Sequence, residues 1–412
     1  MPSSILILDN PVQNYAWGSR TAIASFLGRS SPATLPEAEL WIGAHPKAPS
    51  FIAHPAGLGT LERAIADDPV GLLGPDVCER FDHALPFLFK VLAAAEPLSI
   101  QAHPNQAQAR AGFARENAAG LPFDSPSRNY RDANHKPELV CALTSFDALK
   151  GFRPCAAIVE ALGPVAGHEL EQELRLLSAP DAPTRLRGLL ERLLTIEGDE
   201  RRALLERTTG EAGRRSGTDR AWLWVSRLLA KYPGDTGVLA PLYLNLLTLQ
   251  PGDALYLPAG ELHAYLEGTA LEIMANSDNV LRGGLTAKHI DVAELLATLV
   301  FEPRLPEVLR PADSGPGERT YRTPAREFEL AWIDVHPGRP YAPHPGHGLE
   351  ILLGVEGDAS IRVGGAATSL ARGRSVLVPA SLAAYELQGE GRIARARVPA
   401  ARAWAAAKPP TS

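Results

Sequence analysis

The amino-acid sequence predicts a mainly β protein with an inserted α-helical block, and three observations support this fold class. Apolar and polar residues alternate over 97–104, as they do along a β-strand with one buried face. Leucines recur at helical spacing within 155–232. A turn, a short apolar strand and a second turn follow one another twice, starting at Gly252 and again at Gly373. We therefore expect two related β domains and one helical domain.

The length of 412 residues exceeds what one hydrophobic core usually supports. We expect a discontinuous first β domain formed by residues 1–154 and 233–302, with the helical domain, 155–232, inserted between its two parts. The second β domain is expected over 320–412. Residues 303–326 are rich in proline and glycine and are predicted to be a linker.

The composition excludes several classes of protein. A formal net charge of −6 gives no long-range attraction to nucleic acid or to anionic membranes. No stretch approaches the roughly 20 apolar residues of a membrane span, and the N-terminus lacks the charged region of a signal peptide. The 3 cysteines cannot all pair, which is typical of a reducing compartment. We expect a cytoplasmic monomer that binds neither nucleic acid nor membranes.

The individual elements follow from local patterns. Short strands are expected at 5–8 and 39–43, and an amphipathic helix is expected over 61–74. Two strand-like runs within 86–103 flank a turn. In the helical block, the glycine-rich segment 210–218 is predicted to be a loop.

The strand over 97–104 carries three polar side chains on one face, namely Ser99, Gln101 and His103. The other face is apolar and is expected to lie in the core. A row of a hydroxyl, an amide and an imidazole suits a binding site. The alternative is that these side chains face solvent at a sheet edge.

A second histidine is expected near the first. The stretch 252–263 contains a turn, an apolar strand and another turn that ends in His263. In the second copy of this pattern, the equivalent position is Ala384. We therefore expect two related β units, one with its histidine and one without. His344 and His347 lie among prolines and glycines and are expected in a loop.

A carboxylate follows in the segment HKPE at 135–138, where Pro137 places the start of a strand or a sheet edge. Glu138 and Val140 share a face of that strand. Because a buried carboxylate needs a partner, Glu138 is either a ligand or one half of a salt bridge.

The motifs together resemble a known family. The spacing Gly-x5-Pro-x-Gly-x2-His resembles the second motif of the cupins, whose fold is a double-sheet jelly roll. The ordered set is similar to type I mannose-6-phosphate isomerases: NYAWG at 14–18, AELW at 38–41, PLSIQAHP at 97–104, HKPE at 135–138 and DNVLRGGLT at 278–286. The resemblance implies two cupin jelly-roll domains, the first of them catalytic, plus the helical domain.

The resemblance also implies one zinc ion per chain, held by Gln101, His103, Glu138 and His263. Neutral imidazoles and a carboxylate suit a divalent first-row metal. An amide oxygen is a weaker ligand, which leaves the metal more Lewis acidic. With one anionic ligand the site keeps a net positive charge.

The implied reaction interconverts mannose 6-phosphate and fructose 6-phosphate by moving a proton between C1 and C2. Four residues are implied near the zinc: His135, Lys136, Asp278 and Arg282. Arg282 is assigned to electrostatic stabilisation because it does not readily lose a proton. Three residues are implied at the substrate phosphate: Ser99, Lys90 and Lys288. Next to Lys288 the chain departs from the family, since Ala287 stands where the family usually has proline.

Two other classes of function fit part of this pattern. An iron-dependent cupin oxygenase uses two histidines and one carboxylate, which His103, His263 and Glu138 supply. A cupin that binds a sugar phosphate without turnover is the other alternative. Gln101 and the neighbouring lysines favour the isomerase over the oxygenase.

Overall fold

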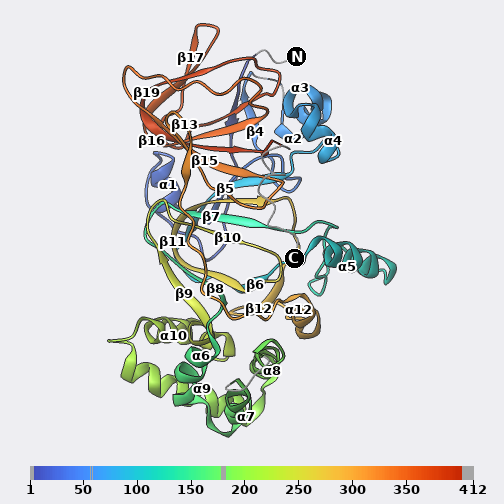
Figure 1. The fold of residues 1–412 in the computed structure, drawn as a ribbon, viewed down its shortest axis with the longest axis vertical. Coiled ribbons are helices and arrows are strands. Elements are labelled where there is room, and N and C mark those ends of the chain that lie inside the picture. Colours follow the sequence, from blue (N-terminus) through green and yellow to red (C-terminus); the bar gives the residue numbers. More distant parts are fainter. Residues whose placement is uncertain (1–3, 56, 58, 178–181, 401–412) are drawn as a thin grey trace.

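The structure is a computed structural model that describes residues 4–55, 57, 59–177 and 182–400 (Figure 1). The predicted helical domain, 155–232, and the predicted second β domain, 320–412, include residues 178–181 and 401–412, which lie outside the described residues. The described chain is mainly β, and the helices within residues 155–243 gather in a block at one end of the molecule (Figure 1). The predicted fold class is confirmed at this level.

Strand β11 (His263–Ala275) is the long central strand of the first sheet. Its beginning pairs with β6 and β8, and the rest pairs with β5 and β7. A register shift between Tyr265 and Glu267 bends the strand. The next residue, Gly268, has no room for a side chain, because a Cβ there would lie 2.6 Å from the Ser145 carbonyl oxygen. The other strands are β2 (Val12–Gln13), β3 (Glu39–Ile42), β5 (Phe87–Ala94), β6 (Ile100–Ala102), β7 (Glu138–Ala142), β8 (Phe146–Phe152), β9 (Leu244–Leu249), β10 (Ala254–Leu257) and β12 (Leu281–Gly284).

The second sheet contains the C-terminal strands together with two strands from the N-terminus. Strand β1 pairs with β18 and with β4, although both β1 and β4 belong to the first sixty residues. Its strands are β1 (Leu6–Asp9), β4 (Phe51–His54), β13 (Ala312–Gly315), β14 (Glu318–Thr320), β15 (Glu329–Val335), β16 (Glu350–Val363), β17 (Ala366–Ser369), β18 (Ser375–Val378) and β19 (Glu386–Arg397).

The prediction of a linker over 303–326 is wrong for its second half, because β13 and β14 form a hairpin there. Gly317 supplies the turn with a φ of +77°. Glu318, the first residue of β14, is buried against Arg395, so the hairpin is held by a long-range ion pair. Local composition carries no signal of that contact.

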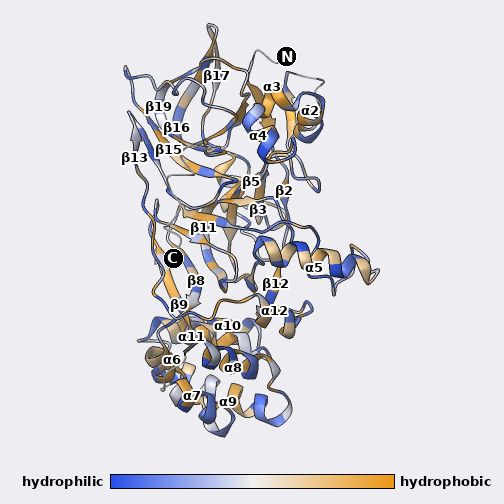
Figure 2. Ribbon diagram, turned by 45° about the vertical axis from the view of Figure 1, so that its right-hand side comes forward, coloured by the Kyte–Doolittle hydropathy of each residue, from blue (hydrophilic) through white to orange (hydrophobic). Residues whose placement is uncertain are grey.

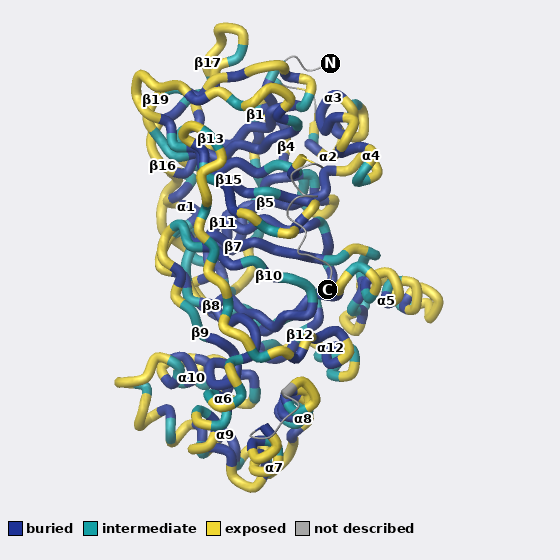
Figure 3. The backbone as a smooth tube through the Cα atoms, viewed as in Figure 1, coloured by how far each residue is buried: buried dark blue, intermediate teal, exposed yellow. Residues whose placement is uncertain are grey.

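Short helices flank the sheets. The expected helix over 61–74 is split at Asp68, whose side chain accepts a hydrogen bond from the Gly71 backbone N–H and so begins a new helix. These helices are α1 (Ala22–Phe26), α2 (Leu61–Asp67), α3 (Pro69–Leu73), α4 (Pro75–Arg80), α5 (Gln106–Ala118) and α12 (Val292–Thr298). Helix α5 projects from the body and is largely exposed (Figure 3).

The helical block lies at the end of the molecule opposite the second sheet (Figure 1). Its helices are α6 (Cys155–Leu162), α7 (Gly167–Leu177), α8 (Ala182–Thr195), α9 (Gly198–Arg215), α10 (Arg220–Lys231) and α11 (Ala240–Tyr243). Their apolar faces (Figure 2) share one core with strand residues such as Ile100 and Leu149. Among the described residues, no helix has the length and apolar character needed to span a membrane.

The predicted loop over 210–218 is wrong for its first part, because α9 continues to Arg215. Glu211 pairs with Arg215 one turn later, at 2.8 Å, and also with Arg214. Such pairs favour an exposed helix and offset the low helix propensity of the local glycines.

The two sheets meet through a common core. The outward-facing Leu139 and Cys141 of the first sheet lie in one cluster with Phe328, Leu330 and Ile351 of the second. Interior strands are correspondingly buried (Figure 3). The second sheet therefore supports the outer surface of the strand that begins at Glu138.

The second sheet encloses a buried charged network around Arg395, which is 1% exposed. Its guanidinium donates hydrogen bonds to both Glu318 oxygens at 2.8 and 2.9 Å and lies 3.3 Å from Glu350. His347 lies in a loop, as predicted, but its ring is buried, and its two nitrogens face the carbonyl oxygens of Gly348 and Leu382.

We predict that the stability of the second sheet falls as the pH drops from about 4.5 toward 2. Burial raises the pKa of Glu318, but Arg395 outweighs this effect and lowers the pKa to about 2. The unfolded chain binds more protons in this window, so protonation favours unfolding. Urea unfolding at pH 5 and pH 3 should show a larger loss of stability in the unaltered protein than in Glu318→Gln. Equal losses would contradict this assignment.

Candidate metal centre and active site

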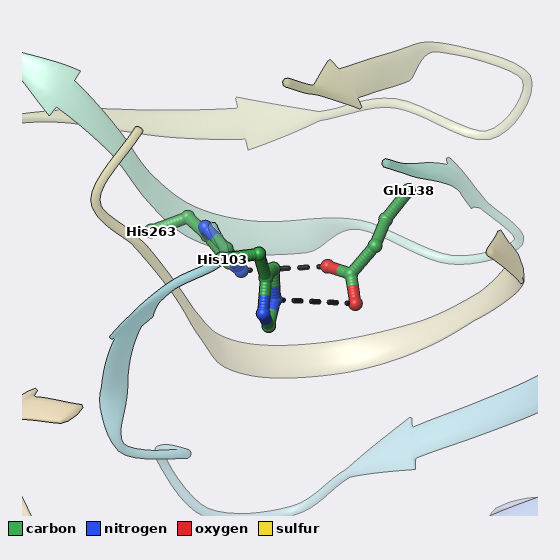
Figure 4. A group of neighbouring side chains, drawn as sticks. All are labelled: His103, Glu138 and His263. Carbon is green, nitrogen blue, oxygen red and sulfur yellow. Dashed lines mark ion pairs between the residues drawn. The ribbon is translucent and has the colours of Figure 1, made fainter. Parts of the chain in front are cut away.

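His103, Glu138 and His263, hereafter the metal centre, converge inside the first sheet (Figure 4). The Nε2 atoms of His103 and His263 each lie 3.4 Å from a different Glu138 oxygen. Glu138 begins β7, His263 begins β11 and His103 directly follows β6. Possible ligand atoms of the three residues lie within 4.8 Å of one another.

The metal centre is buried and its polar atoms are under-satisfied. Each of the three residues is 1% exposed, and both Nε2 atoms and the Glu138 Oε2 atom have no hydrogen-bond partner. Such atoms cost free energy unless a cation compensates for the lost water. Two imidazoles and a carboxylate are a donor set that suits zinc.

Backbone carbonyls orient the two imidazoles. The Nδ1 atom of His103 lies 2.7 Å from the Asn279 oxygen, and that of His263 lies 2.9 Å from the Glu261 oxygen. Because a carbonyl only accepts, the proton belongs on Nδ1 and the Nε2 lone pairs face the centre. Burial lowers the pKa of His103 to about 4, which keeps the imidazole neutral at physiological pH.

Glu138 is ionised in this setting. Burial raises its pKa, but the ammonium of Lys136 is the largest opposing influence, and the pKa lies well below 4.5. The Lys136 Nζ lies 3.0 Å from Glu138 Oε1, so Lys136 faces the centre. The structure therefore brings together Lys136 and the three residues of the metal centre.

Gln101 adjoins the centre through backbone pairing. In β6 it lies across from His263 on one side and from Arg282 on the other. Gln101 and Ser99 are both half-buried. The position of Gln101 is compatible with a fourth metal ligand, and the coordination of a metal by its amide oxygen stays a prediction.

Asp278 lies at the site with two residues that the sequence did not single out. Its Oδ2 atom is 2.8 Å from Lys47 Nζ and 3.8 Å from His45 Nε2. Burial raises the pKa of Asp278, but the hydrogen bond from Lys47 and the charge of His45 outweigh it, so the carboxyl is ionised. The loop that follows β3 therefore contacts the segment that contains Asp278.

His135 is not brought to the metal centre. Its Nε2 atom lies 2.9 Å from Glu327 Oε1, on the segment that leads into the second sheet. Neighbouring residues in an extended chain point in opposite directions, and Lys136 takes the inward position.

Lys90 is also placed differently from its expected role. It is buried between Glu272, at 2.9 Å, and Glu39, at 3.4 Å. Tyr265 donates a hydrogen bond to Glu272, and Trp41 donates one to Glu39. The sequence signal for this cluster was a charged residue within each of two apolar strands, at Lys90 and Glu272.

Arg131, Arg282 and Lys288 form a cation cluster. Burial lowers the pKa of Lys288, and the charges of Arg282 and Arg131 lower it further. Burial and Arg131 likewise lower the pKa of Arg282. Within the described part of the chain, no carboxylate pairs with any of the three. Arg131 and Arg282 are half-buried and Lys288 is exposed. Cations without a carboxylate partner attract an anionic group such as a phosphate.

A buried centre of two histidines and a carboxylate within an antiparallel sheet is typical of a metalloprotein, and its donor set suits zinc. Residues 5–155 match the family described as phosphomannose isomerase type I, catalytic domain, and residues 320–398 match mannose-6-phosphate isomerase, cupin domain. Mannose-6-phosphate isomerase of Escherichia coli is 43% identical over 391 residues, which cover 94% of this chain and 98% of the relative. The chain therefore belongs to the type I mannose-6-phosphate isomerase family, and it is an enzyme with that activity.

Other relatives agree. The human mannose-6-phosphate isomerase is 38% identical over 321 residues, which cover 72% of this chain and 73% of the relative. A crystal structure of zinc-bound mannose 6-phosphate isomerase has a TM-score of 0.89 at 42% identity, and covers 96% of this chain and 100% of that chain. A variant of the Salmonella typhimurium enzyme has a TM-score of 0.90, with the same coverage and identity.

These findings confirm the predicted family, activity and zinc cofactor. They therefore favour the isomerase over the two alternatives, an iron oxygenase and a sugar-binding protein without turnover.

We predict that His263→Ala abolishes tight zinc binding while the fold is retained. The substitution removes one ligand from a site whose other atoms stay in place. Metal analysis after dialysis should find about one ion per chain in the unaltered protein and almost none in the variant, with matching circular dichroism. His344→Ala is the matched control and should retain its zinc. A stoichiometric ion in His263→Ala would contradict the assignment.

Proposed function

We propose that this enzyme interconverts mannose 6-phosphate and fructose 6-phosphate by zinc-assisted proton transfer between C1 and C2. The metal centre beside Lys136 is the observation that carries this proposal. Zinc bound there supplies Lewis acidity that polarises the sugar oxygens at these two carbons.

The proposed ligand set is His103, Glu138, His263 and the amide oxygen of Gln101. Its support is the pairing of Gln101 directly across from His263. One anionic ligand leaves the occupied site with a net positive charge, which suits negative charge that develops on the substrate oxygens.

Lys136 and Asp278 are the two candidates for the group that transfers the proton. A base must remove the proton from C2 of the aldose and return it to C1, while the proton of the O2 hydroxyl is transferred to O1. Lys136 faces the metal centre, and Asp278 is held ionised by Lys47. We favour Lys136 because it lies beside the ligands, where a bound cation favours the neutral amine that a base requires. We assign Asp278 to substrate hydroxyls.

We propose that the substrate phosphate binds at Lys288 and Arg131 of the cation cluster. Ser99, on the same strand face as Gln101, completes this binding site. Lys90 is replaced in this role, because Glu39 and Glu272 already neutralise its charge. Arg282 belongs to the cation cluster and also lies across from Gln101, which suits its assignment to charge stabilisation at the reacting carbons.

The proposed division of labour assigns catalysis to residues 1–154 and 233–302, and no metal to residues 320–412. We propose that both units are cupin jelly rolls. Ala384 has no ligand atom, and the buried Arg395 is itself a fixed cation inside the second sheet. We also propose that the enzyme acts as a cytoplasmic monomer; light scattering would report its mass in solution.

We predict that a deuterium label at C2 of mannose 6-phosphate is partly lost to water during isomerisation. A base that takes a deuteron from C2 exchanges it with solvent before delivery to C1. Nuclear magnetic resonance of the fructose 6-phosphate formed from [2-²H]-mannose 6-phosphate would measure the retained label. Complete retention at C1 would indicate hydride transfer and contradict the proposal.

We predict different kinetic effects for two members of the cation cluster. Arg282→Ala should lower kcat by about 10²–10³ with little change in KM, because its charge acts on the transition state. Lys288→Ala should mainly raise KM, since it acts on the phosphate throughout. If Arg282→Ala changes only KM, Arg282 is a binding residue instead.

A further inference from the structure

The segment that leads into β7 has two faces with different surroundings. Lys136 and Glu138 face the metal centre, and Val140 continues this face into a core within the first sheet. Leu139 and Cys141 point outward into the core shared by both sheets. His135 has the same parity as these outward residues. The position of Glu138 therefore depends on contacts made behind the strand.

The first of these contacts lies before the strand begins. Glu327 is 7% exposed and accepts from His135 through its Oε1 atom at 2.9 Å. Its Oε2 atom accepts the backbone N–H of Arg326 at 3.1 Å. Glu327 lies between β14 and β15, so it is fixed to the second sheet. The ion pair thus joins the entry to β7 with that sheet.

A second contact holds the far end of the strand. The Tyr321 hydroxyl lies 3.1 Å from Cys141 Sγ and donates to the Gly252 carbonyl at 2.6 Å, and it accepts from Trp332 Nε1 at 2.9 Å. Since the hydroxyl has one proton, Cys141 must be the donor to it. Burial raises the pKa of Cys141 to about 12, so the thiol has the proton that this bond needs.

We propose that Glu327 is a positioning residue for catalysis, which acts through His135 to hold Glu138 and Lys136 in place. Tyr321 anchors the other end of the same strand. The second sheet thus takes part in the reaction without touching substrate or metal. This inference rests on the metal-ligand and Lys136 assignments of the proposed function.

The expected size of the effect follows from outer contacts at other metal sites. Loss of a group that orients a ligand typically weakens metal binding about 10- to 100-fold. Glu327 acts through one further residue, so we expect a change near the lower limit, about tenfold. Loss of its side chain also leaves His135 without its hydrogen-bond acceptor and frees the chain before Pro137.

The experiment measures the zinc dissociation constant by chelator competition, at a temperature far below unfolding. Glu327→Ala should bind zinc about tenfold more weakly and show a lower kcat at a KM within about twofold of the original. Glu327→Gln keeps an acceptor for His135 and should restore both values. Asp334→Asn is the matched control, because Asp334 pairs with Arg319 and Arg392 within the second sheet. It should leave zinc affinity unchanged.

Two outcomes would overturn the inference: unaltered zinc affinity and kcat in Glu327→Ala, or equal losses in Glu327→Ala and Asp334→Asn. If Glu327→Ala does not fold, Glu327→Asp carries the same test, because it withdraws the carboxylate by one methylene. The double variant His135→Ala, Glu327→Ala should bind zinc no more weakly than either single variant, because both substitutions remove the same contact. Failure of the unaltered protein to bind zinc would instead contradict the metal-centre assignment.

Discussion

The structure depends on one electrostatic constraint, the burial of the Glu138 carboxylate between the imidazoles of His103 and His263. Three of their polar atoms have no hydrogen-bond partner and no access to water. Such an arrangement is stable only if a cation completes it. The carbonyls behind His103 and His263 fix both rings in the orientation that a cation requires. The same arrangement leaves Lys136 at the edge of the centre, where chemistry is expected.

The long strand β11 connects this centre to the rest of the first sheet. It carries His263 at its start and Glu272 further along, so one strand positions both the metal centre and the buried cluster around Lys90. The helical block packs against one end of this sheet, while the second sheet packs against its outer face. In the second sheet, Arg395 is a permanent cation among buried carboxylates. In the second sheet the buried carboxylates are therefore neutralised by an arginine, whereas in the first sheet His103, Glu138 and His263 form a site for a metal ion.

Much of the site could be predicted because its signals are local. Alternation over 97–104 placed Gln101 and His103 on one face, and the turn pattern located His263. The partners of Lys90 were missed because Glu39 and Glu272 are distant in sequence and meet only in the sheet. Side chains alternate in direction along the extended segment 135–138, so His135 and Lys136 point opposite ways. The outward position of His135 could therefore be predicted from the sequence. The partner Glu327 was not, since it comes from the other sheet.

The measurement that tests the central claim most directly is isomerase activity before and after removal of the metal. Purified enzyme would be treated with a chelator, dialysed and assayed for conversion of mannose 6-phosphate to fructose 6-phosphate. Activity should disappear with the zinc and return in proportion to added zinc, with full recovery at one ion per chain. Full turnover in a preparation shown to be free of divalent metal would contradict the role assigned to His103, Glu138 and His263.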